Sequence, residues 1–294
     1  MTLLSLVYAH PPAICVHLWF VTSALWEYQV SDRRPIGLFD SGVGGLSVLR
    51  EVRRLLPVED LIYYGDNAYV PYGPRPVEFI RRRSEAICRF LLSQGAKALV
   101  VACNTASSAA LSYLRERFTV PIVGMVPAVK PAAGATRART VGVLATETTV
   151  KGDSFADLVL RFAEGVQVRT VVGAGLVPLV EDGDVSSPRA ETLVRSYIEP
   201  IVAQGADVIV LGCTHYPFLR PLIERVAGPG VTVLDPAEAV ARQVQRVLAE
   251  DGLLDESGHP GRQIYYTSGD PAEFGRVATL LLAQDVLALP SPEL

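Results

Sequence analysis

The sequence predicts an α/β fold made of two similar doubly wound parallel-sheet domains that face each other across a cleft. From residue 36 onward, short β-branched runs alternate with longer amphipathic stretches, the pattern of a parallel sheet covered by helices on both faces. The stretches 96–118 and 205–227 repeat one construction: a strand, a cysteine, a threonine and a helix. An internal repeat of this kind indicates two related domains.

The repeat extends upstream of the cysteines. The spacing from Asp40 to Cys103 is 63 residues and that from Ala145 to Cys213 is 68, so the two blocks have nearly the same layout. Taken in chain order, the strands we expect are 36–39, 61–64, 98–101, 121–125, 141–144, 168–172, 207–211, 231–234 and 263–267.

These elements divide the chain into four segments. We expect residues 1–34 to be a poorly ordered extension, because the chemistry-bearing motifs begin only at Ile36. The first α/β domain spans 35–127 and the second 128–235. The C-terminal segment, 236–294, has its own helix, strand and helix, and we expect it to return to the first domain.

Composition narrows the class of function. The chain has 294 residues and a formal net charge of -4, without the basic excess that draws proteins to nucleic acid or anionic lipid. We therefore expect a small-molecule partner, with neither nucleic acid nor a membrane. The four cysteines are far apart and form no CxxC pair, which favours a reducing cytoplasm over a disulfide framework or a zinc site. No cofactor and no metal are expected.

A glycine-rich turn, FDSGVGG at 39–45, follows the first strand. Its backbone N–H groups are suited to an anion, although Ser47 stands where a dinucleotide fingerprint has its third glycine. The polar side chains of Asp40 and Ser41 lie at the strand end, where ligands of open α/β sheets bind. A tight turn that simply needs glycine is the plainer interpretation.

Two cysteines occupy matching positions. Cys103 and Cys213 each follow the end of a strand, so one cleft between the domains receives both thiols. A single cysteine after an apolar strand is most often a small buried hydrophobe, but two at equivalent positions favour chemistry. Because Cys103 opens a helix, we expect the helix N-terminus to lower its thiol pKa. His215 is a general acid or base, or an anchor of its loop, and Cys88 is an ordinary core residue.

The sequence leaves the roles of two acidic residues undecided. Asp66 and Glu181 lie in roughly equivalent turns of the two halves, within YYGDNAYVPYG and VPLVEDG. Either carboxylate supports a thiol or caps a helix, and the sequence does not choose between these roles.

Four motifs in this order, FDSGVGG, YYGDNAYVPYG, ACNTAS and GCTHYP, resemble the glutamate racemase family. The resemblance covers about 36–270 and implies interconversion of L- and D-glutamate without metal or pyridoxal, which supplies D-glutamate for peptidoglycan, and it favours a homodimer. By motif position it makes Cys103 and Cys213 the acid/base thiols, assisted by Asp40 and His215. The same match implies that glutamate is held by Asp40, Ser41, Tyr72, Gly73, Asn104, Thr105, Thr214 and His215.

Two alternatives remain at this point. A related racemase or isomerase of aspartate, hydantoins or a dicarboxylate would share the paired cysteines. A two-domain amino-acid binding protein would explain the cleft and the duplication without any chemistry. Glutamate is favoured because the second cysteine motif reads Cys-Thr-His and the first strand ends in Asp40-Ser41, features that resemble the glutamate branch of the family.

Overall fold

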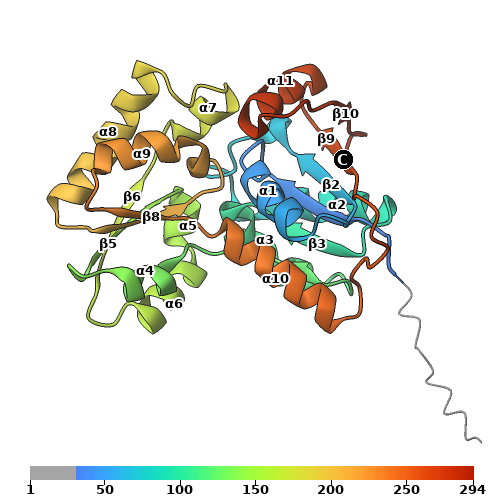
Figure 1. Ribbon diagram of the computed structural model, residues 1–294, viewed down its shortest axis with the longest axis horizontal. Helices are drawn as coiled ribbons and strands as arrows, with labels where there is room; N and C mark the ends of the chain where they lie inside the picture. The colour runs from blue at the N-terminus through green and yellow to red at the C-terminus, as the bar shows by residue number, and fades with distance from the viewer. Residues whose placement is uncertain (1–30) are drawn as a thin grey trace, which may run out of the picture. The chain divides into compact units, whose positions relative to one another are not determined.

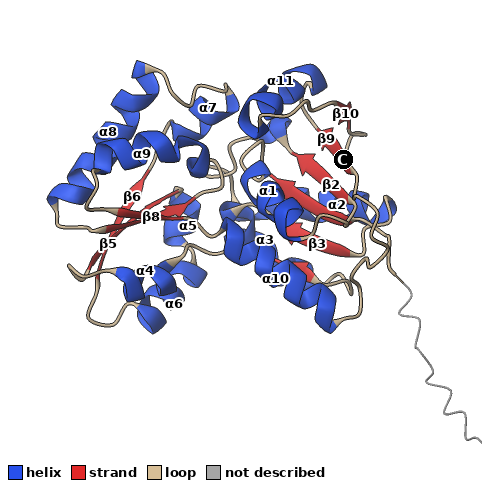
Figure 2. Cartoon of the chain, in the orientation of Figure 1, coloured by secondary structure: helices blue, strands red, loops and turns tan. Residues whose placement is uncertain are grey.

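The computed structural model describes residues 31–294, which form two parallel β-sheets with helices on both faces of each (Figures 1 and 2). This confirms the predicted α/β class with two doubly wound sheets. Residues 1–30 lie outside the described residues, and with them most of the expected extension. Residues 31–34 are described: the Ser31 hydroxyl donates to the Asp255 side chain, and the Asp32 carbonyl accepts a hydrogen bond from Lys97.

The first sheet has six strands in the order β10-β9-β2-β1-β3-β4, all parallel. Their bounds are β1 Ile36–Asp40, β2 Leu61–Gly65, β3 Ala98–Val101, β4 Ile122–Val123, β9 Gln263–Thr267 and β10 Ala288–Pro290. Figure 1 shows the C-terminal β9 and β10 beside the N-terminal β2. The two ends of the described chain therefore share one sheet.

Helices cover both faces of this sheet. Alternate side chains of β1, such as Leu38 and Phe39, enter different apolar cores because neighbouring residues of a strand point to opposite faces. One core contains α2 Val77–Ser93 and α3 Asn104–Arg115; the other contains α1 Leu46–Leu55, α10 Ala237–Glu250 and α11 Pro271–Leu282. Strands buried on both faces explain why these segments read as continuous apolar runs.

The second sheet has four parallel strands in the order β6-β5-β7-β8. Its strands are β5 Thr140–Ala145, β6 Gln167–Val172, β7 Val208–Gly212 and β8 Thr232–Leu234. One face packs on α4 Val129–Ala135 and α6 Asp153–Phe162, and the other on α8 Pro188–Ala203 and α9 Arg220–Ala227. The remaining helices are short: α5 Glu147–Lys151, α7 Leu176–Glu181 and the 3₁₀ turns Asn67–Tyr69 and Tyr216–Leu219.

The internal repeat is visible in the strand order. The run β2-β1-β3-β4 in the first sheet corresponds to β6-β5-β7-β8 in the second. All nine expected strands are present, although the one expected at 121–125 is only Ile122–Val123, and β10 was not expected. Because β3 and β7 hold equivalent central positions, Cys103 and Cys213 follow equivalent strand ends.

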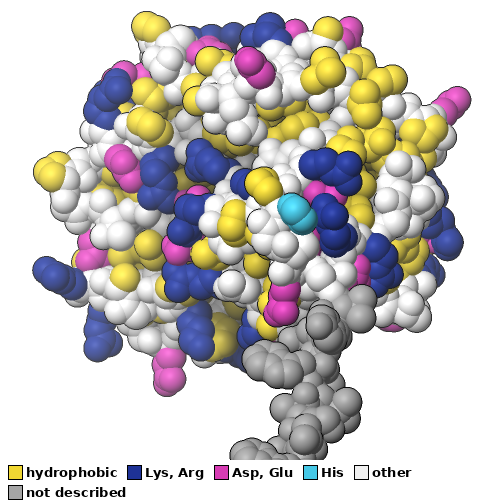
Figure 3. Space-filling model, turned by 45° about the vertical axis from the view of Figure 1, so that its right-hand side comes forward, with side chains coloured by type: hydrophobic (Ala, Val, Ile, Leu, Met, Phe, Trp, Pro, Cys, Tyr) yellow, Lys and Arg dark blue, Asp and Glu magenta, His cyan; other side chains and the backbone are white. Residues whose placement is uncertain are grey.

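The surface of the described residues carries mixed charges. Figure 3 shows Lys and Arg side chains interspersed with acidic and apolar ones on one face. Within residues 31–294 no helix combines the length and the apolar character that crossing a bilayer requires.

Candidate active site

The carboxyl ends of the two sheets' strands supply the walls of one small cavity. Both cysteine positions contribute to it, together with polar residues from the turns that follow β1, β2 and β5. The lining consists of Ser41, Pro71, Tyr72, Gly73, Cys103, Asn104, Thr105, Thr146, Val177, Cys213, Thr214 and His215. The structure thus brings together every sequence-predicted site residue except Asp40, which lies directly behind this wall.

Cys103 caps the helix that follows β3. Its sulfur accepts a hydrogen bond from the Ala106 N–H at 3.4 Å and lies 4.0 Å from the Ser41 hydroxyl. Burial, and next the charge of Asp40, raise the pKa of the Cys103 thiol well above its ordinary value. The expectation of a lowered pKa was wrong, because the helix N–H acts in that direction but is outweighed by burial. The surroundings of Cys103 therefore favour the protonated thiol.

Asp40 is fully buried beneath the cavity. One carboxylate oxygen accepts the Gly42 N–H at 2.8 Å and the Ser41 hydroxyl at 3.2 Å, and the other accepts the Thr214 hydroxyl at 2.8 Å. Burial raises its carboxyl pKa, partly offset by the nearby His215. Since Thr214 follows β7, this carboxylate joins the two cysteine-bearing turns.

Cys213 has a different neighbour. Its sulfur lies 3.7 Å from His215 Nδ1, and His215 Nε2 lies 2.6 Å from Glu181 Oε1. Burial by itself lowers the histidine pKa, but contacts with Cys213 and then Glu181 outweigh it, so the pKa of His215 is well above its usual value. A cationic imidazole next to sulfur stabilises a thiolate.

The glycine-rich turn approaches this histidine and glutamate closely. A methyl group at Gly42 would overlap the Glu181 carboxylate, and one at Gly44 would overlap the His215 ring. The turn's N–H groups do bind anions, but these are carboxylates of the protein itself: the Val43 N–H donates to Glu181 at 2.8 Å. Glycine is therefore required here for close packing between the two halves.

The Tyr72 side chain is held from behind the cavity. Its hydroxyl donates to Asp66 Oδ2 at 2.5 Å, and Arg83 forms a buried bidentate ion pair with the same carboxylate. With its hydroxyl engaged, Tyr72 offers the cavity its ring and backbone rather than its O–H. Asp66 supports Tyr72, not a thiol, whereas Glu181 supports His215.

Asn104 has the least satisfied side chain of the cavity wall. Its carboxamide is buried, and neither its Nδ2 nor its Oδ1 has a hydrogen-bond partner among residues 31–294. Buried polar groups without partners are costly, and ligand sites are where such groups occur. Donor and acceptor together suit an amino acid's carboxylate and ammonium groups.

Sequence reasoning missed Thr146. It follows β5 as Ser41 follows β1, and its hydroxyl lies 2.9 Å from that of Thr105 across the cavity. In the repeat, Asp40 and Ser41 correspond to Ala145 and Thr146, so the sequence did contain the information that could have identified Thr146. Val177, on α7, also lines the cavity, but no sequence pattern predicted its position there.

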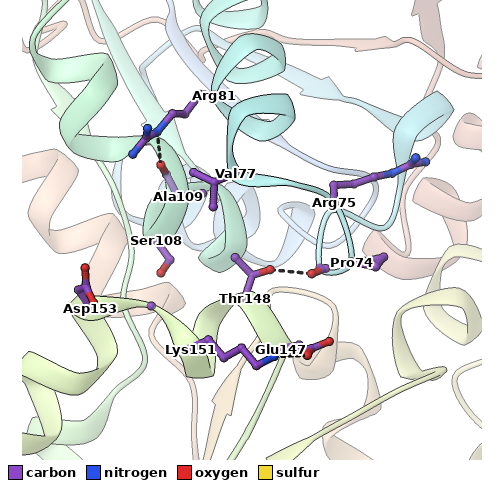
Figure 4. A pocket seen from close by; sticks show the side chains of 12 residues that line it. Pro74, Arg75, Val77, Arg81, Ser108, Ala109, Glu147, Thr148, Lys151 and Asp153 are labelled. Atoms are coloured by element: carbon purple, nitrogen blue, oxygen red, sulfur yellow. Dashed lines mark hydrogen bonds and ion pairs between the residues drawn. The ribbon is translucent and has the colours of Figure 1, made fainter.

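The cavity is nearly closed. It has a volume of about 10 Å³, close to what one water molecule needs. A hollow of about 500 Å³ lies beside it and shares Gly73 (Figure 4). There the Thr148 hydroxyl, from α5, donates to the Gly73 carbonyl at 2.6 Å, and with the Thr105–Thr146 contact this bond ties the two halves together. Entry of any ligand of several heavy atoms requires these contacts to part.

No three His, Cys, Asp or Glu side chains within residues 31–294 are grouped so that they could hold a metal ion.

Comparison with known proteins decides the family. The family model described as Asp/Glu/Hydantoin racemase matches residues 36–244. The chain belongs to the Asp/Glu/hydantoin racemase family. A glutamate racemase of Methylococcus capsulatus is 50% identical over 253 residues, which cover 86% of this chain and 93% of the relative.

Solved structures agree. Glutamate racemase of Thermus thermophilus, in complex with β-chloro-D-alanine, has a TM-score of 0.75 and 42% identity, covering 88% of this chain and 97% of that one. The Escherichia coli enzyme, in complex with L-glutamate and the activator UDP-MurNAc-Ala, has a TM-score of 0.75 and 35% identity, covering 84% and 95%. The chain is thus an isomerase of the amino-acid racemase class, not a two-domain binding protein.

Proposed function

We propose that the chain interconverts L-glutamate and D-glutamate, with Cys103 and Cys213 as opposed acid and base and with neither a metal nor pyridoxal. The observation that carries this proposal is the pair of thiols after equivalent strands β3 and β7, lining one cavity. The relatives and solved structures named glutamate racemase support the substrate. The D-glutamate would serve peptidoglycan synthesis in a bacterial cytoplasm.

The chemistry requires two groups of unequal protonation. One thiolate removes the α-proton and the other thiol delivers a proton to the opposite face, which inverts the carbon. The raised pKa of Cys103 favours its protonated thiol, and His215 Nδ1, 3.7 Å from the Cys213 sulfur, is placed to accept that thiol's proton and return it. The cysteine that acts as the base for one enantiomer of glutamate acts as the acid for the other enantiomer.

Neighbouring groups are available for the charged substrate. The unpartnered amide of Asn104 and the hydroxyls of Ser41, Thr105 and Thr214 face the cavity, together with the backbone at Gly73. Dipoles fixed in this way offset the negative charge that develops at the α-carbon and its carboxylate when the proton leaves.

The test is racemisation of pure L-glutamate by the purified chain without added cofactor, followed by circular dichroism. We expect turnover of glutamate and a specificity constant for aspartate at least about 10-fold lower, since a missing methylene displaces the side-chain carboxylate. Comparable constants for the two amino acids would contradict the assignment to glutamate, and turnover of a hydantoin alone would replace it.

A further inference from the structure

Glu181, at the end of α7, is bound by donors from three segments. Its Oε1 accepts the Val43 N–H at 2.8 Å and contacts His215 Nε2 at 2.6 Å, and its Oε2 accepts from Asn67 Nδ2 at 2.7 Å. Asn67 opens the 3₁₀ turn after β2 in the first sheet, whereas Glu181 lies in the second half. The Asn67 hydrogen bond therefore fixes the second carboxylate oxygen from across the two halves.

The orientation of the Asn67 amide is set by Glu181, whose carboxylate only accepts, and a neighbour on β9 bonds the other end of the amide. The Gly269 N–H donates to the Thr267 hydroxyl oxygen at 3.0 Å, and the Thr267 hydroxyl donates its own hydrogen to Asn67 Oδ1 at 3.1 Å. With Oδ1 accepting, Nδ2 is the group that faces Glu181. A flipped amide would place its oxygen against the Glu181 carboxylate and lose that bond.

This polarity determines the tautomer of the histidine. Because Glu181 is an acceptor held by two other donors, His215 Nε2 carries a hydrogen. His215 Nδ1 is then the nitrogen that exchanges a proton with the Cys213 sulfur, 3.7 Å away. A continuous chain of hydrogen bonds thus runs from Thr267 through Asn67, Glu181 and His215 to Cys213.

We propose that Asn67 is a positioning residue of the racemase reaction, which holds Glu181 so that His215 keeps Cys213 competent as acid and base. The inference rests on the proposed function. Asn67 does not line the cavity, and its amide hydrogen bonds in the described residues go to Glu181 and Thr267. Its loss therefore affects the chemical step, seen in kcat, more than substrate binding, seen in KM.

Other charged groups also face this carboxylate and bear on any pH effect. Tyr63 on β2 and Asp40 at the end of β1 are close enough to Glu181 to feel its charge. On the α11 side, Arg276 donates to the carbonyl of the adjacent Asp182. None of these groups is changed by substitution at Asn67, so differences between Asn67 variants isolate its own hydrogen bond.

Two substitutions separate positioning from packing. N67A removes the donor and should lower kcat by about 10- to 100-fold, the range for hydrogen bonds to charged groups, with KM within about twofold. N67D is isosteric and places two carboxyls in contact, which share a proton at low pH and lose it as the pH rises. N67D should therefore approach wild-type activity near pH 6 and fall further behind as the pH increases, whereas the deficit of N67A should not grow with pH.

Variants of Thr267 test the next hydrogen bond in the chain. T267V removes the hydroxyl that bonds Asn67 Oδ1 and should lower kcat in the same direction as N67A but by less, and T267S should restore it. Thermal melting of all four variants identifies any that fail to fold. Wild-type kcat in N67A, or an N67D deficit that does not change with pH in a folded protein, would overturn the proposal.

A readout without turnover separates this inference from the proposed function. Alkylation of each cysteine by iodoacetamide, followed by peptide mass spectrometry, reports thiolate character. N67A should slow alkylation of Cys213 and leave Cys103 and Cys88 unchanged; equal rates at Cys213 would contradict the positioning role. Failure of the wild type to racemise glutamate would instead overturn the proposed function, and the alkylation rates would still test the hydrogen-bond chain.

Discussion

At the residue scale, the two halves of a duplicated scaffold have acquired different partners for their cysteines. Asp40 lies near Cys103, and its equivalent in the second half is Ala145; His215 lies beside Cys213, where the first half has Thr105. A symmetric scaffold thereby carries one protonated thiol and one thiol paired with imidazole. The proposed two-base reaction needs one thiol protonated and the other deprotonated in each direction, and different neighbours bias which thiol holds the proton.

Substitution of either thiol should stop the reaction. C103S and C213S should each lower kcat by about 100- to 10,000-fold, the contribution of a general acid or base, because a serine hydroxyl is a far weaker acid. Binding of glutamate, measured by calorimetry, should persist in both. C88A is the control, because Cys88 lies in the α2 core and burial raises its thiol pKa to about 12. Substantial racemisation by either serine variant would exclude the paired-thiol mechanism.

The buried carboxylate of Asp40 should reduce stability as the pH rises. Its folded-state pKa is raised, mainly by burial, so its favourable contribution is fully present below the unfolded pKa and is lost as the pH rises through the folded pKa. D40N lacks this ionisation. Its melting temperature relative to wild type should therefore rise, by about 2 °C or more, between about pH 4, near the unfolded pKa, and about pH 9.

Differential scanning fluorimetry of both proteins across that range checks this prediction. A melting-temperature difference that is independent of pH would mean that Asp40 does not carry the buried charge. Activity of D40N should fall at the same time, since the group near Cys103 is altered while the fold is retained.

At the element scale, most of the fold could be predicted because buried parallel strands leave a continuous apolar signal. The exception β10 is three residues long and ends in Pro290, too short for any periodicity. The two cysteines could be predicted as candidates from the repeat, and His215 from its place two residues after Cys213. The roles of Asn67 and Glu181 could not, because their hydrogen bonds join segments 114 residues apart and no local pattern records such a contact.

The segment just before β1 illustrates the same limit. The sequence predicts a poorly ordered extension over residues 1–34, yet within its last four residues Ser31 bonds the Asp255 side chain, and the buried Lys97, ion-paired with Glu59 at 2.6 Å, also donates to the Asp32 carbonyl. These contacts tie residues 31–34 to both β3 and the loop after α10.

Truncations at two positions test this anchoring. Deletion of residues 1–34 should leave kcat within about twofold but lower the melting temperature by about 2–8 °C, since it removes two or more hydrogen bonds, one of them to a buried charge. Deletion of residues 1–30 leaves these contacts intact and should match the full chain in both. Equal melting temperatures for the two truncations would show that the anchor contributes nothing.

At the scale of the whole molecule, function depends on the meeting of two sheets with the same strand order. Neither half contains a complete site: Asp40 bonds Thr214, Val43 bonds Glu181, and Thr148 bonds the Gly73 carbonyl. The cavity between them is nearly closed, so turnover includes opening and reclosing around the substrate. The homodimer stays a prediction.

The central claim is that each enantiomer loses its proton to one cysteine and gains a proton from the other. It is tested most directly by racemising protiated L-glutamate in D2O and measuring α-carbon deuterium in both enantiomers at low conversion. Because the donating thiol exchanges with solvent between turnovers, early D-glutamate should carry deuterium while the remaining L-glutamate stays protiated. Early D-glutamate that retains the substrate's hydrogen would show that one base serves both faces, and would contradict the account.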